Sequence, residues 1–158
     1  MTWLEDIEEA FDEYVFQHVD VRAITERVLK YEFTDASERE NKALFWKGEL
    51  NFFEFVVTRT ATLPLIGGPT TTLDAVSAEV RYTIQKISQS GNPGDNYRRA
   101  RDAISTVIDR VVDGLGTSWQ GNVDYYLTQE SPSEISEASI AGVECWRTIY
   151  RFRAERLA

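Results

Sequence analysis

The chain has 158 residues, of which 42% are hydrophobic and 27% charged, as expected for one globular domain over residues 1–158. Its net charge of -9 disfavours tight binding of nucleic acid, because an acidic surface repels phosphates. One cysteine excludes an internal disulfide and favours a reducing compartment, and no basic signal-peptide region or apolar run of membrane-spanning length (roughly 20 residues) is present.

An amphipathic helix is predicted over residues 2–17. Thr2 followed by Glu5 matches a capping box, and acidic side chains gather on the polar side of the helix. The apolar stripe at helical spacing consists of Leu4, Ile7, Phe11, Tyr14 and Val15. Residues 21–33 fit either a helix or a strand, and we favour a strand at their end. The polar residues 34–43 predict a loop.

Residues 44–60 are rich in aromatic and β-branched side chains and predict one long strand. Apolar residues occur on both faces of its segment 52–57, which indicates burial on both sides there. Residues 61–75 hold two prolines and a Gly-Gly pair and predict a long connection. Strict alternation over residues 76–87 predicts a half-buried strand. Its apolar side is Val76, Ala78, Val80, Tyr82 and Ile84.

A turn over residues 88–95 precedes a helix predicted at about 97–113, with Asp95 or Asn96 as its cap and Gly114 and Gly116 as its end. A short strand over 122–128, a polar loop over 129–141 and a last strand over 142–155 complete the chain. The fold class that these elements predict is α+β, with an antiparallel or mixed sheet of about four to five strands and two main helices on one face.

Residues suited to catalysis are few. His18, the only histidine, stands near the end of the first helix, where a favourable contact with the helix dipole is expected. Cys145 is expected to be a buried thiol, and one Cys with one His does not make a zinc site. The Gly-rich stretches lack the Gly-Lys-Ser/Thr of a phosphate-binding loop. The remaining candidates for an acid–base site are strand carboxylates, namely Glu49, Glu54, Glu79 and Asp124.

Two charged clusters are the candidate interfaces. Residues 1–20 carry seven acidic side chains and no Lys or Arg, whereas the last fifteen residues carry four Arg and two Glu. The acidic candidates are Glu8, Glu9 and Asp12, whose spacing favours a solvated helix face over a metal site. The basic candidates, here called the arginine row, are Arg147, Arg151 and Arg153. Three uses of the row stay open: an exposed face, ion pairs with a neighbouring chain, or phosphate contact.

The second half of the chain resembles the tail terminator proteins of long-tailed bacteriophages. The likeness covers about residues 97–156: YRRARDAISTVIDRVVDGLG, the segment TSWQGNVDYYL, a loop with Ser131-Pro132-Ser133, and the strand VECWRTIYRFRAER. The first half matches in element order, with an opening helix and two long strands joined by a long loop. This resemblance implies a virion protein of the tail and neck, assembled in the host cytoplasm.

The implied role is a ring, usually of six subunits, which stops the growing tail tube and joins it to the neck. The implied partners are other copies of the chain, the tail tube protein and the head–tail connector, with genome DNA passing through the lumen without specific binding. Such a role needs no catalysis, cofactor, metal or membrane. The alternatives are another neck component, such as a head-closure or tail-completion protein, a non-viral α+β adaptor or binding module, and an enzyme that uses dispersed carboxylates.

Overall fold

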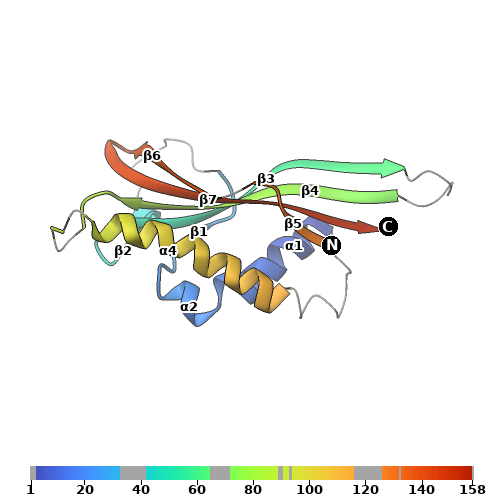
Figure 1. Cartoon of the computed structure of the whole chain (residues 1–158), viewed down its shortest axis with the longest axis horizontal. Helices are drawn as coiled ribbons and strands as arrows, with labels where there is room; N and C mark the ends of the chain where they lie inside the picture. The colour runs from blue at the N-terminus through green and yellow to red at the C-terminus, as the bar shows by residue number, and fades with distance from the viewer. Residues whose placement is uncertain are drawn as a thin grey trace.

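The computed structural model describes residues 3–32, 42–64, 72–88, 91–92, 94–115, 126–131 and 133–157. Within them, seven strands form one mixed sheet, and two main helices pack on one of its faces (Figure 1). In chain order the elements are α1 (Trp3–Phe11), the π-helical η1 (Asp12–Phe16), α2 (Val19–Arg22), β1 (Val28–Leu29), β2 (Phe45–Trp46), β3 (Glu49–Pro64), β4 (Thr72–Gln85), α4 (Asp95–Arg110), the π-helical η2 (Val111–Leu115), β5 (Tyr126–Gln129), β6 (Glu134–Ile140) and β7 (Val143–Leu157).

Three long antiparallel strands, β3, β4 and β7, form the centre of the sheet. The strand order is β1-β3-β4-β7-β5, with β2 also paired to β3 and β6 also paired to β7. Only β1 runs parallel to its neighbour among the described strands. The α+β class with two main helices is therefore confirmed, whereas the predicted four to five strands are fewer than the seven found.

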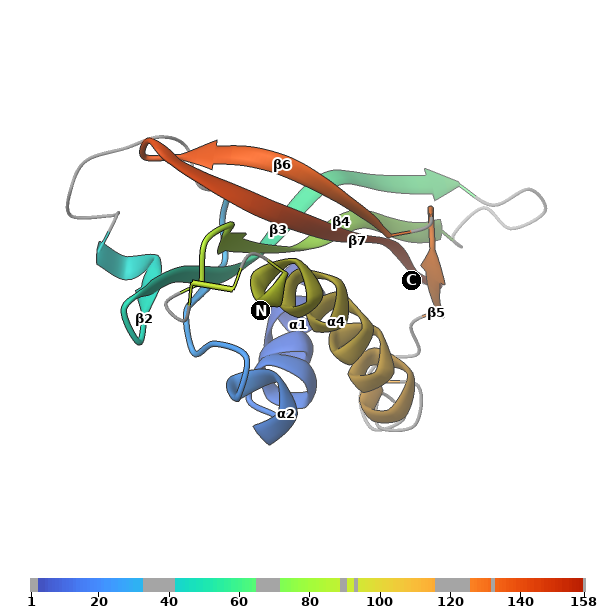
Figure 2. The same cartoon turned by 60° about the vertical axis from the view of Figure 1, so that its left-hand side comes forward.

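The main core lies between the helices and one face of the sheet, called the helix face (Figure 2). All five apolar side chains predicted for one side of residues 76–84 point into this core and are at most 1% exposed, as their alternation predicts. The prediction of a half-buried strand is wrong, because Ser77 and Thr83 on the other side of this central strand are buried as well. The predicted helix stripes lie against them: Ile7, Phe11 and Val15 from the first helix, and Ala100, Ala103, Ile104, Val107 and Val111 from α4 and η2. The ring of Phe11 stacks on Phe152 at a centroid distance of 4.8 Å.

The opposite side of the sheet, called the outer face, carries a second and smaller apolar cluster. Its buried members are Leu44, Leu50, Phe52, Ile140 and Cys145. Residues 52–56 are all buried, so the predicted burial of this stretch on both faces is confirmed. The sheet is thus covered by helices on one face and partly covered by its own apolar cluster on the other.

Two predicted boundaries are wrong because tight turns divide the segments. Residues 44–60 are not one strand: β2 and β3 form a hairpin whose turn residues Lys47 and Gly48 have φ values of 52° and 80°. Residues 134–140, predicted as loop, form β6, which pairs with β7 through a turn at Ala141 and Gly142 with φ values of 51° and 79°. In both turns the first residue lacks the usual Asn or Asp signal of such hairpins.

The connection predicted over residues 61–75 is also too long. β3 continues to Pro64 and β4 begins at Thr72, because the two strands keep their antiparallel register to that point. In the ambiguous segment 21–33, the favoured strand is present but limited to Val28–Leu29, and the short helix α2 precedes it. The expectations for Thr2, residues 34–41, Gly67-Gly68, residues 122–125 and Gly116 fall outside the described residues.

The predicted cap of the second main helix is wrong. Gly94 occupies the N-cap position without a side-chain bond, and Asp95 is already helical. Asn96 is fully buried, and its amide donates to the Gln85 carbonyl at 2.9 Å, so it ties the helix to the end of β4 instead. At the other end, helical structure continues through Gly114 to Leu115. No helix in the described part of the chain is long and apolar enough to cross a bilayer.

Candidate subunit interface

The arginine row lies on the outer face of the sheet, and its members share that face because residues an even number of positions apart on a strand point to the same side. Arg147, Arg151 and Arg153 alternate along β7 with side chains that enter the helix-face core. Their side chains are 20%, 38% and 38% exposed, respectively. They are therefore half-buried groups laid across the sheet rather than free cations extended into solvent.

Each arginine of the row faces an acid of the same chain. Arg147 places its guanidinium 3.7 Å from the Glu54 carboxylate on β3 and donates to the Thr83 hydroxyl at 3.2 Å. Arg151 donates to Glu79 on β4 at 3.0 Å. Arg153 donates to Glu155, two residues along its own strand, at 2.5 Å. Cross-strand register brings the first two acids beneath the row, although they are far away in sequence.

Arg81 extends the same network across the middle of the outer face. It donates to Glu79 at 2.7 Å and lies 3.2 Å from Glu32. Burial alone would raise the pKa of Glu79, but the hydrogen bonds and charges of Arg81 and Arg151 outweigh it, so the pKa lies below its usual value. The four arginines of this network face four acids, so the outer face is close to electrically balanced.

The acidic candidates occupy the other layer of the molecule. Because Ile7, Phe11 and Val15 turn towards the sheet, Glu9 on the opposite side of the same helix turns away from it. Glu9 is exposed, Glu8 and Asp12 are partly buried, and Asp12 lies 3.9 Å from Lys30. The structure therefore does not bring the two charged clusters together within one subunit; it places them on opposite sides.

The strand carboxylates considered for acid–base chemistry are held by arginines where the structure describes them. Glu49 accepts from Arg99 at 2.6 Å, and Glu54 and Glu79 belong to the outer-face network. Glu49 faces away from the outer network, towards the start of α4. Asp124 falls outside the described residues. Each described acid thus lies against an arginine, and Glu49 is on the other face of the sheet from Glu54 and Glu79.

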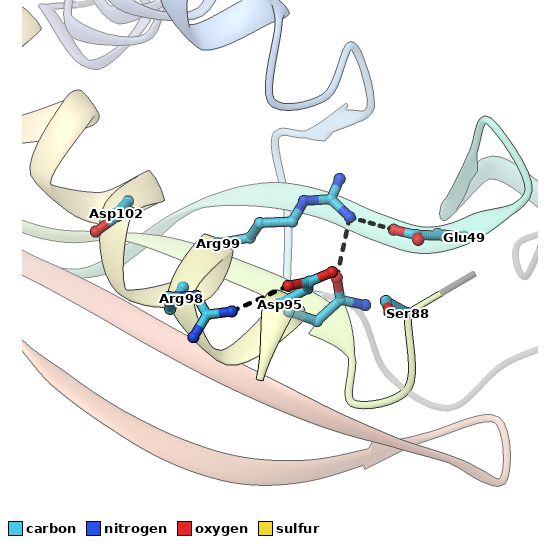
Figure 3. A pocket seen from close by; sticks show the side chains of 7 residues that line it. Glu49, Ser88, Asp95, Arg98, Arg99 and Asp102 are labelled. Carbon is cyan, nitrogen blue, oxygen red and sulfur yellow. Dashed lines mark hydrogen bonds and ion pairs between the residues drawn. The ribbon is translucent and has the colours of Figure 1, made fainter. Parts of the chain in front are cut away.

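An open hollow of about 720 Å³ lies at the start of α4 (Figure 3). Figure 3 shows Arg99 reaching from the helix to Glu49, while Arg98 turns to Asp95. Arg99 also donates to the side-chain oxygen of Asn96. The longest of these contacts is 3.0 Å. The charged side chains that line the hollow form ion pairs and hydrogen bonds within the chain. The hollow therefore presents a polar surface to a ligand but, among its described residues, no charged group that lacks a partner in the chain.

The remaining candidates have structural roles. His18 is the N-cap of α2, and its Nδ1 accepts from the Asp20 amide at 3.2 Å, so the predicted contact with the end of the first helix is replaced by a capping contact. Cys145 is fully buried, and burial raises the pKa of its thiol to about 11. Within the described residues no group of three or more His, Cys, Asp or Glu could hold a metal ion.

Sequence reasoning missed the acids that neutralise the arginine row. Pairing of Arg151 with Glu79 depends on the register between β4 and β7, which strand periodicity alone does not supply. It also missed β6, which forms an edge of the sheet. A comparison of the sequence with models of protein families gives no match, and a comparison with curated proteins gives no match either.

Proposed function

We propose that this chain is a non-enzymatic virion subunit, which assembles with copies of itself into a ring, of six subunits by resemblance, at the end of a bacteriophage tail tube. The ring ends polymerisation of the tube and joins it to the neck. The resemblance of residues 97–156 supports the phage role. The described part of this stretch folds as α4, η2, β5, β6 and the central strand β7, with α4 packed on β4 and β7 and with β5 and β6 paired to β7.

The non-enzymatic part of the proposal rests on the ion pairs that the carboxylates of the sheet form with arginines. Glu49, Glu54 and Glu79 each lie against an arginine of the same chain. Carboxylates held in this way fix the position of strands and side chains, whereas an acid–base catalyst has to exchange protons with a substrate. Their arrangement therefore favours a rigid building block.

The distribution of charge suits a ring through which DNA passes. A cation row without matching acids would bind phosphates, but the arginine row is balanced by acids on the same face. The polar side of α1 and η1 is acidic and repels phosphates. Whichever of these surfaces lines the lumen, genome DNA can slide past without being held.

The test is a tube-elongation assay. Purified subunit is added to growing tubes of the tail tube protein from the same phage, and tube lengths are measured by electron microscopy. We expect elongation to stop and tube ends to bind the subunit. An equal amount of another acidic protein of similar size is the control. Normal growth of the tubes at a large excess of subunit would sink the proposal.

A further inference from the structure

Among the strands that the structure describes, none pairs with one side of β3 over most of its length. On that side, β2 pairs with Glu49 and Leu50, β1 pairs with Phe53 and Glu54, and no other described strand is present. The side of residues 55–63 that faces away from β4 is here called the free edge. In Figure 1 this part of β3 runs towards the right of the view, away from β1 and β2.

The backbone of the free edge is oriented for pairing with another strand. Phe53, opposite Tyr82, donates its N–H away from β4 to the Arg27 carbonyl at 2.8 Å. Thr60 lies opposite Val76 and Thr62 lies opposite Asp74. Val76 and Asp74 are six and eight residues from Tyr82 along β4, so their backbone groups point in the same direction as those of Tyr82. Since N–H direction alternates along an antiparallel strand, the N–H and C=O groups of Thr60 and Thr62 also point outwards.

The other side of the sheet ends in β6, which pairs with β7 on one side only in the described part of the chain. β6 has seven residues and exposes Glu134 and Glu137. Glu134 lies opposite Ile149, and Arg59 on the free edge lies opposite Ser77, so both charged side chains belong to the outer face. Neither makes an ion pair within the described residues.

We propose that the free edge of one subunit pairs with β6 of a second copy of the chain, with Arg59 near Glu134 on the outer face. Strand direction supports this choice. β3, β4, β7 and β6 are successive neighbours and alternate in direction. If a second copy in the same orientation is placed beside β3, its β6 therefore runs antiparallel to β3, and the alternation continues across the contact. Unpaired edges are templates for such addition.

This inference rests on the proposed function only in that copies of the chain associate. The two edges differ, so the contact is heterologous, and repetition closes a ring if the rotation between neighbours completes a turn. All helices then lie on one side of the joined sheet and all arginine rows on the other. The acidic helix of one subunit does not meet the arginine row of the next.

Cysteine cross-linking between two variants tests the pairing. Chains with Arg59→Cys are mixed with chains carrying Glu134→Cys, oxidised both free at high concentration and on tail tubes, and analysed by mass spectrometry. The fully buried Cys145 should not interfere. We expect a mixed disulfide, since paired strands bring these residues within bonding distance. The matched control pair, Glu9→Cys with Arg153→Cys, tests contact between the acidic helix of one subunit and the arginine row of another. We expect no mixed disulfide from this pair.

Cross-linking of the control pair alone, or of neither pair under both conditions, would overturn the inference. A second variant, Thr60→Pro, removes one outward N–H without removing a bond to β4, and Gln129→Pro on β5, where the N–H points away from β7, is its control. We expect Thr60→Pro to weaken association by about tenfold, the factor for one lost backbone hydrogen bond. Unchanged association of Thr60→Pro, with folding verified by circular dichroism, would contradict edge pairing.

The two proposals fail in different ways. If tubes are ended normally by Thr60→Pro and the edge pair does not cross-link, the edge inference is wrong and the tail role stands. If the edge pair cross-links but tubes keep growing, the subunit self-associates as inferred and the tail role is wrong.

Discussion

Glu79 illustrates how single residues hold the outer face together. Its carboxylate receives hydrogen bonds from Arg81 on its own strand and Arg151 on β7, and its side chain is only 13% exposed. A buried carboxylate without these donors would prefer its neutral form. The lowered pKa therefore reports stabilisation of the charged form in the folded state.

Replacement of Glu79 tests this account. Glu79→Gln removes the charge that holds two arginines and should lower the free energy of unfolding by about 1–3 kcal/mol at pH 7. Because the folded-state pKa is lowered, the contribution is present above the ordinary value of 4.5 and is lost as pH falls through the folded-state pKa. Urea denaturation at pH 7 and pH 3 checks both statements.

Two outcomes of that measurement would contradict the account: no loss of stability at pH 7, or an equal loss at both pH values. Glu137→Gln is the matched control. Glu137 pairs with Lys86 through a carboxylate that is 69% exposed, so its replacement should leave the free energy of unfolding unchanged within error.

Cys145 tests the small cluster of the outer face. Its thiol is fully buried among apolar side chains, and its pKa is raised to about 11, so little reactive thiolate forms at pH 8. We expect no reaction with a thiol reagent at pH 8 in the folded protein and complete reaction in urea. The surface variant Arg59→Cys should react at once. Rapid modification of folded wild-type protein would show that the cluster is open.

At the scale of elements, Phe11 joins the first helix to the sheet. It stacks on Phe152 and lies 5.0 Å from Phe55 between ring centroids. Phe11→Ala should cost about 3–5 kcal/mol in the free energy of unfolding, since it leaves a cavity between the two layers. Val19→Ala, at a side chain that is 72% exposed, is the control and should cost little. A loss below about 1 kcal/mol for Phe11→Ala would mean that the helix is not anchored there.

The turn between β6 and β7 gives a prediction of the opposite sign. Ala141 has a φ of 51°, a conformation that strains alanine and suits asparagine. Ala141→Asn creates the Asn-Gly pair typical of two-residue hairpins and should raise the free energy of unfolding by about 0.5–1 kcal/mol. Chemical denaturation measures the change. Ala23→Asn, at a φ of -67°, should bring no gain, and an equal gain at both sites would disprove the strain argument.

Elements with strong periodicity were predictable from sequence, and elements defined by turns were not. Apolar and polar residues alternate so regularly from Val76 to Ile84 that the pattern predicts both a strand and the side of it that enters the core. In the same way, the apolar stripe of α4 predicts a helix and its buried side. β6 is not predictable in this way because its sequence EISEASI shows no regular alternation of apolar residues and its turn is Ala-Gly. The spacing of the arginine row predicts one shared face, but two of its neutralising acids, Glu54 and Glu79, come from other strands, and only the register brings them to the row.

At the scale of the whole molecule, the subunit has two layers with different surfaces. One carries the acidic side of the first helix, the other a charge-balanced network and two strand edges. A ring-forming subunit needs two different surfaces that match each other and a third that meets the tube. In the ring that we propose, the two strand edges would meet the first need, and neither layer would hold the DNA that passes.

The proposed tail role can be tested by electron microscopy of tail tubes mixed with the purified subunit. We expect a ring of copies at one end of each tube, with its helices on one side of a continuous sheet, and no subunit along the shaft. Tubes with bare ends at saturating subunit, or tubes covered along their length, would contradict it.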